Sequence, residues 1–278
     1  MALYFTSINS GSNGNCYYIG NDHEAVLVDI GLTCKEVEIR MNRLGLSISK
    51  VKAIFISHEH SDHIKGLAVF AKKYKLPVYI STLTLRNSRL LLDANNTFSL
   101  SHQQHIQIGS LKVAAFSKFH DAADPYSFTV ECNEVRVGVF TDIGSVCDRL
   151  IAHFKNCHAA FLEANYDAQM LENGSYPYFL KRRITNGHGH LSNTQALELF
   201  INHKAPYMSH LLLSHLSKDN NDAALVEKLF KNVAGDTFIK VASRHEETEL
   251  YYVSNSQNTP EPYSFDPSLY QPAQLNLF

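Results

Sequence analysis

The segment 57–63, with the sequence SHEHSDH, constrains this chain more than any other, because it places three histidines and an aspartate between an apolar run and a helical pattern. In an α/β protein, a rigid strand aims such side chains and the following loop leaves them accessible. His58 and His60 point to one side of an extended chain, and Asp62 and His63 face the same space from another angle. Imidazole and carboxylate groups together suit zinc, manganese or iron. A helix cap would account for Asp62 but not for the histidines, so the segment predicts ligands for two metal ions.

Composition and charge limit the class of protein. The 278 residues, 45% of them hydrophobic, are enough for a sizeable core in one large domain or two small ones. The net charge of −2 excludes a generally basic nucleic-acid coat but leaves room for a local basic patch. The five cysteines never form a CxxC pair, the start lacks a signal-peptide pattern, and no apolar run approaches the roughly 18 residues of a membrane span. We therefore expect a reduced cytoplasmic protein without a membrane segment.

Hydrophobic periodicity predicts alternating strands and helices. The expected strands cover 3–8, 15–20, 24–29, 52–56, 77–80, 127–132, 135–141, 159–162, 211–215, 237–242 and 248–253, with a further hairpin at 105–118. The expected helices cover 33–44, 64–75, 82–93, 145–155, 194–203 and 222–232. The turn at 9–15 is rich in Ser, Asn and Gly, so it serves either as a plain hairpin turn or as a cradle of backbone N–H groups for a phosphate.

Three further residues that can bind metal follow apolar strands. His120 lies at a strand end before a loop and supplies the third ligand of a site with the first two histidines of SHEHSDH. Asp142 also ends an apolar strand, and a carboxylate there can bridge two cations with its two oxygens. His215 ends another apolar strand and completes a second site with the last two ligands of SHEHSDH.

Two later stretches carry further chemistry. His190, in the stretch NGHGHLSN, lies at a helix start that Ser192 or Asn193 would cap, where the helix dipole disfavours the charged imidazole. The run YFLKRRI contains Lys181 and Arg182. Such a run is either a solvated helix face or, beside a metal centre, a contact surface for a phosphate backbone.

The order of these motifs resembles that of a known family. HEHSDH is the HxHxDH signature of the metallo-β-lactamase superfamily. HEHSDH, FHDAADP, TDIG, EANYD, YPYFLKRRI, GHLSN and LSHLSKDNN, in this order, resemble its YycJ/WalJ branch over about residues 5–253. The resemblance implies an α/β fold, an αββα sandwich of two facing mixed β-sheets with helices outside. It also implies a metal-dependent 5′–3′ DNA exonuclease that serves repair or replication. Where the family usually has histidine, this chain has Tyr166, which affects substrate contacts rather than the metal centre.

The same resemblance assigns roles within the site. Two divalent ions, zinc or manganese with iron as a further candidate, would be held by His58, His60, Asp62, His63, His120, Asp142 and His215. Water shared by two cations has its pKa lowered from about 15.7 toward roughly 7, and the resulting metal-bound hydroxide attacks phosphorus. Asp62 would orient that hydroxide. His190 would protonate the leaving oxygen as general acid, or it only makes hydrogen bonds in its loop.

Two further sets of residues complete the expected site. Asp29 would support a ligating histidine from behind, or it caps the helix expected at 33–44. The residues expected to contact the substrate are Tyr166, Lys181, Arg182 and Lys218.

The composition changes at 254–278, where four prolines and many Ser, Asn and Gln residues are typical of a flexible tether beyond the hydrolase domain at 1–253. The tether ends in QLNLF, which resembles the peptide that binds the bacterial sliding clamp. Residues Leu275, Leu277 and Phe278 would fill an apolar pocket and Gln274 would bond at its rim, or the tail folds back onto its own core. Tethering to the clamp would raise the local DNA concentration without a large basic surface.

Other functions fit parts of the sequence. A phosphodiesterase for RNA or small cyclic nucleotides would use the same ligands. A thioesterase or a secreted lactamase is disfavoured by the cytoplasmic pattern, by GHLSN and by the clamp-like tail. A non-catalytic scaffold bound to the clamp is disfavoured by the complete set of seven candidate ligands. The leading interpretation is therefore a dinuclear-metal DNA nuclease.

Overall fold

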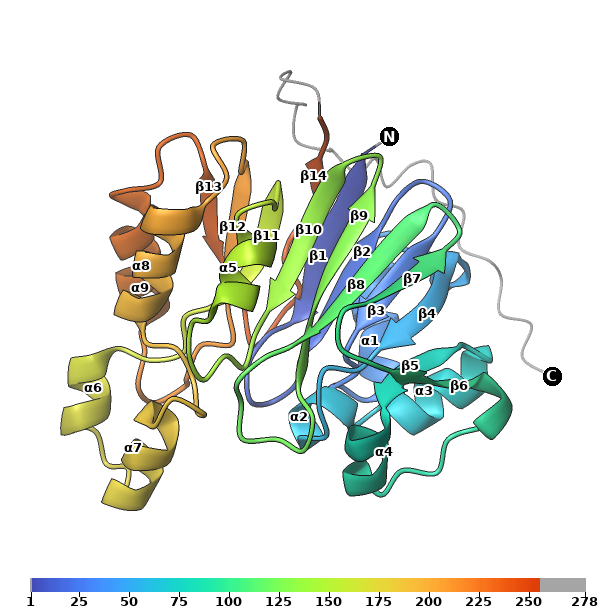
Figure 1. Ribbon diagram of the computed structural model, residues 1–278, viewed down its shortest axis with the longest axis horizontal. Helices are drawn as coiled ribbons and strands as arrows, with labels where there is room; N and C mark the ends of the chain where they lie inside the picture. Colours follow the sequence, from blue (N-terminus) through green and yellow to red (C-terminus); the bar gives the residue numbers. More distant parts are fainter. Residues whose placement is uncertain (1, 256–278) are drawn as a thin grey trace.

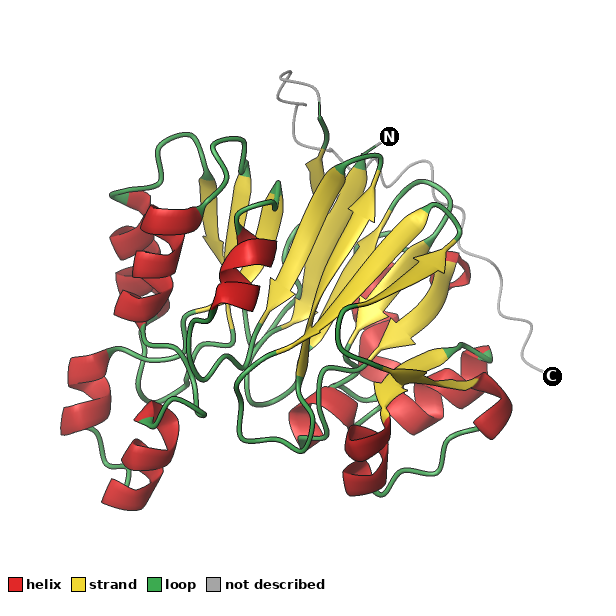
Figure 2. Cartoon of the chain, in the orientation of Figure 1, coloured by secondary structure: helices red, strands yellow, loops and turns green. Residues whose placement is uncertain are grey.

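Two seven-stranded β-sheets face each other in the computed structural model, which describes residues 2–255, and helices flank the sheets (Figure 1). The four layers, helices and sheets in the order αββα, confirm the expected fold (Figure 2). Of the predicted tail, only residues 254 and 255 are described, and the predicted clamp-binding peptide at 274–278 lies outside the described residues. Between residues 2 and 255, no helix has the length and apolar character needed to cross a bilayer.

The first sheet comes mostly from the first hundred residues. Its strand order is β14-β1-β2-β3-β4-β5-β6, antiparallel from β14 to β3 and parallel from β3 to β6. The strands are β1 (Leu3–Asn9), β2 (Cys16–Gly20), β3 (Ala25–Val28), β4 (Val51–Phe55), β5 (Val78–Ser81), β6 (Thr97–Leu100) and β14 (Tyr251–Val253). The helices of this half are α1 (Cys34–Arg43), α2 (Ser61–Ile64), α3 (Leu67–Tyr74) and α4 (Thr82–Ser88), with 3-10 turns η1 (Ile48–Lys50) and η2 (Ala94–Asn96).

The second sheet mirrors this arrangement. Its order is β13-β12-β11-β10-β9-β8-β7, parallel from β13 to β10 and antiparallel from β10 to β7. The strands are β7 (Gln104–Ile108), β8 (Leu111–Ser117), β9 (Tyr126–Cys132), β10 (Val135–Phe140), β11 (Ala159–Glu163), β12 (His210–Ser214) and β13 (Phe238–Val241). The helices are α5 (Asp148–Phe154), α6 (Ala168–Asn173), α7 (Tyr178–Thr185), α8 (Asn193–His203) and α9 (Ala223–Lys231).

Alternation of side chains along the strands produces three apolar layers. In β2, Tyr17 and Ile19 point between the two sheets, where they join Phe128 and Phe161 of the second sheet. Tyr18, between them in sequence, belongs instead to the layer that contains α1 and α3. Because apolar layers cover both faces of the first sheet, every residue of β3 is buried. The core therefore holds the strands rigidly and leaves their ends to carry chemistry.

The helix expected at 64–75 is divided into α2 and α3 at Gly66. The Gly66 N–H donates to the carbonyl of Ile30 at 2.9 Å, and any side chain at this position would overlap the carbonyl oxygen of Leu32. The approach of this loop therefore prevents one continuous helix. The apolar periodicity of the segment does not report that contact, because it depends on a distant part of the chain.

Two other segments also differ from the predicted elements. The helix expected at 82–93 ends at Ser88, because Asp93 caps the turn η2 by accepting the N–H of Asn95, and the strand β6 follows. The periodicity predicts no helix at 168–185, where α6 and α7 lie. No residue of α7 is fully buried, so the helix does not turn a fully buried apolar stripe to the core, the feature by which a helix is usually found.

Candidate metal centre

Five strands end at one edge of the sandwich, and each leads to a polar side chain of one cluster. In the first sheet, the parallel neighbours β3 and β4 lead to Asp29 and His58. In the second sheet, the parallel neighbours β10, β11 and β12 lead to Asp142, Glu163 and His215. The carboxyl ends of parallel strands meet at one edge, which is where α/β proteins bind ligands.

Three of these residues have an unusual backbone conformation. The angle φ is +62° at Asp29, +54° at Asp142 and +55° at His215. Residues other than glycine rarely adopt this left-handed conformation, although Asp and His are among those enriched in it. Such strain persists where the surrounding structure fixes it, and it clusters at functional sites. The three strained strand ends therefore mark this edge as the functional one.

Three histidines form the first set of candidate ligands. Ligand nitrogens of His58, His60 and His120 all lie within 4.8 Å of one another. Nε2 of His58 lies 3.0 Å from Nδ1 of His60, and Nε2 of His120 lies 3.4 Å from the same atom. His58 and His120 are buried and His60 is half-buried. Three imidazole nitrogens that converge on one point can hold a cation.

A second set lies beside the first and consists of Asp62, His63 and His215, whose ligand atoms also lie within 4.8 Å of one another. Oδ2 of Asp62 is 3.5 Å from Nε2 of His63 and 3.6 Å from Nε2 of His215. Asp142 lies between the two sets. Its Oδ1 is 3.5 Å from Nε2 of His215 and 3.9 Å from Nε2 of His120, and its Oδ2 is 3.3 Å from Nε2 of His63. The fold thus brings together all seven predicted ligands.

Partners behind the imidazole rings determine which nitrogen faces the centre. The Nδ1–H of His63 donates to Oδ2 of Asp29 at 2.7 Å, and the Nδ1–H of His120 donates to the carbonyl oxygen of Gly189 at 3.0 Å. Because the proton of each neutral ring is then on Nδ1, Nε2 is left as the free ligand atom.

Asp29 lies behind two of the histidines. Its Oδ1 accepts the N–H of Ser57 at 2.8 Å, and its Oδ2 accepts the Ser57 hydroxyl at 2.7 Å. Oγ of Ser57 lies in turn 2.9 Å from Nδ1 of His58. The helix α1 has Thr33 as its N-cap. Of the two roles expected for Asp29, the contacts favour support of the ligands over capping.

Two buried atoms of this centre have no hydrogen-bond partner among the described residues, namely Oδ2 of Asp142 and Nε2 of His215. A buried polar atom without a partner costs about 1–3 kcal/mol, and in native proteins a missing ion is one explanation for it. Imidazole and carboxylate are the ligand types that zinc, manganese and iron accept. The residues present therefore fit divalent metal ions.

Burial and charge together set the protonation of the centre. Burial of His215 opposes its charged form, but nearby carboxylates, Asp142 first among them, raise its pKa to about 10. Burial likewise opposes the charged form of His63, and the carboxylates around it raise its pKa well above the usual value. At His120, burial dominates and lowers the pKa to about 4. The charged rings occupy the places where cations would bind, so metal binding would release their protons.

His190 lies beside the centre and is held by a carboxylate that was not among the expected site residues. Its Nδ1–H donates to Oε1 of Glu163 at 2.8 Å. Its ring centroid lies 5.3 Å from that of His120 and 5.2 Å from that of His215. The His190 side chain is 21% exposed, whereas Glu163 is fully buried. A partly exposed imidazole oriented by a buried carboxylate can hold and deliver a proton.

Glu163 joins four groups of the site. Its Oε1 also accepts the Nδ1–H of His215 at 3.0 Å, and its Oε2 accepts the N–H groups of Ile143 at 2.8 Å and Leu191 at 3.1 Å. Burial raises the pKa of this carboxyl, but the His190 and His215 imidazoles together outweigh it, and the pKa falls to about 2. Glu163 directly ends the apolar strand AAFLE. That is the signal that identifies Asp142, and it could have found Glu163 as well.

The turn at 9–15 supports the centre from one side. The Nδ2–H of Asn15 donates to Oδ2 of Asp62 at 3.2 Å, and this nitrogen lies 3.1 Å from Nε2 of His63. Four backbone N–H groups of the turn donate to protein acceptors, those of Ser10, Gly11, Gly14 and Asn15. These contacts favour a supporting turn over a phosphate cradle.

The predicted substrate-binding residues lie in different surroundings. Lys181 and Arg182 belong to α7, and Lys218 is exposed in the loop after β12. Tyr166 is only 6% exposed and forms a backbone bridge with Ser192. It therefore packs against the loop that carries His190 and offers little surface to a substrate.

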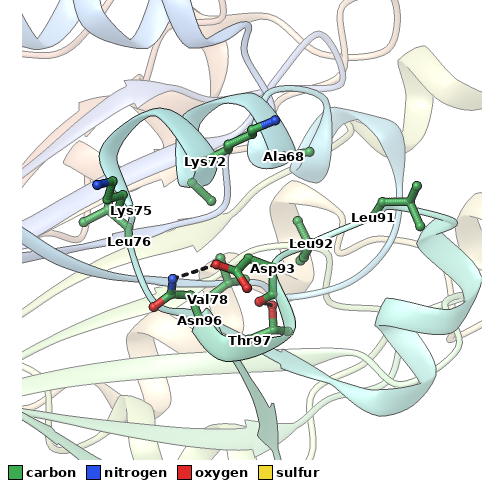
Figure 3. A pocket seen from close by; sticks show the side chains of 11 residues that line it. Ala68, Lys72, Lys75, Leu76, Val78, Leu91, Leu92, Asp93, Asn96 and Thr97 are labelled. Atoms are coloured by element: carbon green, nitrogen blue, oxygen red, sulfur yellow. Dashed lines mark hydrogen bonds between the residues drawn. The ribbon is translucent and has the colours of Figure 1, made fainter.

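A cavity of about 620 Å³ lies elsewhere, between α3 and the segment 91–97 (Figure 3). Its lining includes the apolar residues Leu76, Val78 and Leu92 together with Lys72 and Lys75. None of the candidate metal ligands lines it, and neither does the Glu163–His190 pair. We therefore place the chemistry at the strand ends and not in this cavity.

Comparisons with known proteins identify the family of the chain. Residues 10–119 match the family model of the metallo-beta-lactamase superfamily. The chain is 38% identical over 224 residues to exodeoxyribonuclease YycJ of Bacillus anthracis, which covers 80% of this chain and 85% of the relative. It is 32% identical over 233 residues to exodeoxyribonuclease WalJ of Streptococcus pneumoniae serotype 2, which covers 82% of this chain and 87% of the relative.

A solved structure shows the same fold. The metallo-beta-lactamase fold protein YhfI from Bacillus subtilis matches with a TM-score of 0.71 at 19% identity, over 91% of this chain and 99% of that chain. At that identity the likeness concerns the fold alone. Taken with the two relatives, it leads to one assignment. The chain belongs to the YycJ/WalJ branch of the metallo-beta-lactamase superfamily and is a metal-dependent hydrolase of that fold.

Proposed function

We propose that the protein is a dinuclear-metal exonuclease that hydrolyses DNA from the 5′ end in repair or replication. The two relatives that match most of the chain both carry the name exodeoxyribonuclease. The observation that carries the proposal is the Glu163–His190 pair beside the two ligand sets. Hydrolysis of a phosphodiester needs an activated nucleophile and a proton for the leaving oxygen, and the site offers groups for both.

The ligand geometry supports two ions rather than one. His58, His60 and His120 would hold the first, and Asp62, His63 and His215 the second, with Asp142 shared between them. Oδ1 of Asp142 lies near one histidine of each set, at 3.9 Å and 3.5 Å. Zinc and manganese suit these ligands best, and iron is a further candidate. When bound, the ions would supply Lewis acidity for the phosphoryl oxygens and an attacking water of lowered pKa.

The chain's own residues would position the water and move the protons. Asp62 is 18% exposed, and its Oδ2 would bind the second ion together with His63 and His215, so its carboxylate would also orient the attacking water beside that ion. His190 would give its Nε2 proton to the oxygen that leaves phosphorus. Glu163 keeps the ring in place by accepting from Nδ1, so Nε2 is the nitrogen free to act.

Basic side chains near the centre would hold the strand. Lys181, Arg182 and Lys218 would contact phosphates, because exposed cations neutralise the backbone charge of DNA. Tyr166 would act indirectly, through the loop of His190 against which it packs.

A substrate panel tests the proposal. The full chain, supplied with manganese or zinc, is incubated with single-stranded and double-stranded DNA and RNA, labelled at either end, and with a cyclic dinucleotide. We expect DNA to be shortened from the 5′ end in a metal-dependent way. Faster turnover of RNA or the cyclic dinucleotide would establish the alternative phosphodiesterase instead. No metal-dependent cleavage of any of these esters would overturn the proposal.

The role of His190 has a matched control two residues away. His190→Ala should retain bound metal and lose about 10²- to 10⁴-fold in turnover, the range for a general acid. His188 is exposed and its ring packs edge-on to Phe119 at 5.9 Å, so His188→Ala should turn over normally. A His190→Ala enzyme that keeps both its metals and its full rate removes this assignment.

The sequence of residues 274–278, which lie outside the described residues, supports binding to a partner protein. Their sequence QLNLF resembles the clamp-binding peptide, with Gln274 at the rim and Leu275, Leu277 and Phe278 in the pocket. Such binding would place the enzyme with replicating DNA in the cytoplasm. Deletion of residues 274–278 should abolish co-elution with a bacterial sliding clamp, and unchanged co-elution rejects the partner.

A further inference from the structure

The helix α7 exposes aromatic side chains instead of burying them. Tyr178 is 74% exposed and Phe179 is 72% exposed, and α7 has no buried residue. Figure 1 shows α6 and α7 outside the layers of the sandwich, below the helices α8 and α9. Single exposed apolar residues are common on protein surfaces. Two adjacent aromatic rings of this exposure instead indicate a surface that receives a partner.

The exposed residues of α7 share one face. Residues four apart in a helix are neighbours, so Tyr178 lies beside Arg182, and Phe179 lies beside Arg183. The guanidinium of Arg182 is 6.0 Å from the centroid of the Tyr178 ring. The opposite face carries Leu180 and its neighbours, which are partly buried. One exposed face thus alternates two aromatic rings with two arginines.

The charged residues of α7 itself are all positive, and Asp121 of another loop pairs with one of them, Arg183. Between residues 173 and 190 there is no aspartate or glutamate, whereas α7 contains Lys181, Arg182 and Arg183. The chain as a whole has a net charge of −2, so the cluster is a local feature. Aromatic rings interleaved with cations are the surface on which unpaired nucleic acid binds, because bases stack on the rings and phosphates meet the cations.

Contacts tie this face to the metal centre. Arg183 forms an ion pair with Asp121, and Oδ1 of Asp121 lies 3.5 Å from Nε2 of His120. Phe179 is four residues, about 6 Å along the helix axis, from Arg183. The end of α7 also touches the loop of the proposed general acid, since the N–H of His190 donates to the carbonyl of Ile184 at 3.0 Å.

The loop after α7 is packed against the helix end. A side chain at Gly189 would overlap the carbonyl oxygens of Arg183 and Ile184. Because both of these are backbone atoms, they could not move aside without displacing α7. The position of α7 is therefore coupled to that of His190, the neighbour of Gly189 in sequence.

We propose that Tyr178 and Phe179 form a stacking platform for unpaired bases at the end of the DNA strand that enters the metal centre. This inference rests on the proposed nuclease function and adds the substrate class, a strand with a single-stranded end. A second copy of this chain is the other partner that an aromatic face could receive. The positive charge and the contact with the metal-ligand region favour nucleic acid.

The test compares substrates of different length. Oligothymidylates of roughly 2 to 16 nucleotides bracket the site sizes of single-strand binders. For the unmodified chain, kcat/KM should rise with length and then level off. Phe179→Ala should remove most of this rise, with KM for the longer oligonucleotides higher by about 5- to 150-fold, the equivalent of one lost base–aromatic contact. Phe179→Trp should restore the rise, whereas Phe179→Leu should not.

Phe238 provides the matched control. It is 46% exposed and begins β13, at the opposite end of the parallel strands from the metal centre. Phe238→Ala should leave the dependence on length unchanged. If Phe179→Ala also keeps it, the platform is refuted. If the variant instead converts a dimer to a monomer in a solution mass measurement and the loss of activity follows that change, the face is a protein interface.

A binding measurement distinguishes failure of this inference from failure of the proposed function. A fluorescent phosphorothioate oligothymidylate, which resists cleavage, is titrated with the metal-loaded full chain while its anisotropy is followed. Tighter binding by the unmodified chain than by Phe179→Ala, with Phe179→Trp close to the unmodified chain, supports the platform even if no DNA is cleaved. Equal binding by all three refutes it, whatever the panel shows about the nuclease.

Discussion

The substitution Glu163→Gln keeps the shape of a fully buried side chain but replaces one acceptor oxygen by an NH₂ donor. Glu163 accepts four hydrogen bonds, two from backbone N–H groups on Oε2 and two from the Nδ1–H groups of His190 and His215 on Oε1. A glutamine has a single acceptor oxygen, so it can accept hydrogen bonds either from the two backbone N–H groups or from the two imidazoles. If the NH₂ group faced the two backbone N–H groups, these would lose two hydrogen bonds to a charged acceptor, each worth about 1.5–3 kcal/mol.

The two imidazole rings can move their proton from one nitrogen to the other, whereas the backbone N–H groups can only donate. We therefore expect the glutamine oxygen to stay on the backbone N–H groups and its NH₂ to face both rings. His190 and His215 would then accept on Nδ1 and carry their proton on Nε2. A neutral His190 held in this form is a poor acid, so DNA turnover should fall by about 10²- to 10⁴-fold. His215 would lose its free ligand nitrogen, and metal affinity should fall on the order of 10- to 100-fold.

The assay measures kcat on DNA and on bis(p-nitrophenyl) phosphate at saturating metal, together with the metal content of the protein. The nitrophenolate leaves without a proton, so its release should fall much less than DNA turnover. Glu131→Gln is the control, because Glu131 pairs with Arg136 at the other end of the second sheet. A Glu163→Gln enzyme with the metal content and DNA turnover of the unmodified chain would falsify the reasoning.

Four further predictions concern the ligands and the fold. Asp29→Asn should weaken metal binding about 10- to 100-fold, because it disturbs the bond at 2.7 Å that orients His63, and a metal titration checks this. Gly31→Ala should destabilise the fold by about 1–3 kcal/mol, since its methyl group would overlap the carbonyl oxygen of Asp62, and urea unfolding measures the loss. Burial lowers the pKa of His153 to about 4 from its usual 6.5. The unfolded chain therefore binds the extra proton between these values, and stability falls as pH drops from 6.5 to 4. His153→Phe should flatten that decline relative to the unmodified chain, and equal slopes at pH 5 to 7 would contradict it. Removal of metal by a chelator should lower Tm on the order of 5–10 °C if the metal had been present at about 100 times Kd. An unchanged Tm would mean that metal does not stabilise the folded state.

Most of the candidate site follows from one local rule. A polar residue at the end of an apolar strand, or within three residues after it, lies at the edge where an α/β fold opens. His58, Asp142 and His215 meet that rule, and the rule needs only the sequence. Glu163 meets it as well and begins the motif EANYD, but the sequence gives it no partner, and its role follows from the 2.8 Å contact of its carboxylate with His190.

The platform on α7 shows the opposite case. In the sequence, Tyr178 and Phe179 are aromatic residues that would ordinarily be placed in a core. Their exposure depends on α7 standing outside the layers of the sandwich, and the positions of α6 and α7 come from packing. Tyr166, which the resemblance places at the substrate, is 6% exposed, and its contact with the substrate stays a prediction.

The sequence by itself determined the alternation of strands and helices, the order of the strands along the chain and the identity of the seven candidate ligands, because each depends on periodicity or spacing over a few residues. The αββα architecture followed from the resemblance of the motifs to those of the metallo-β-lactamase superfamily. Only the tertiary structure decided which nitrogen of each ring is free, that Asp29 supports the ligands instead of capping a helix, and that Glu163 holds two histidines. Those choices depend on partners far apart in the chain, 34 residues for Asp29 and His63 and 52 for Glu163 and His215. Hydrogen bonds of that kind exist only once neighbouring parallel strands have paired in each sheet and their ends have met.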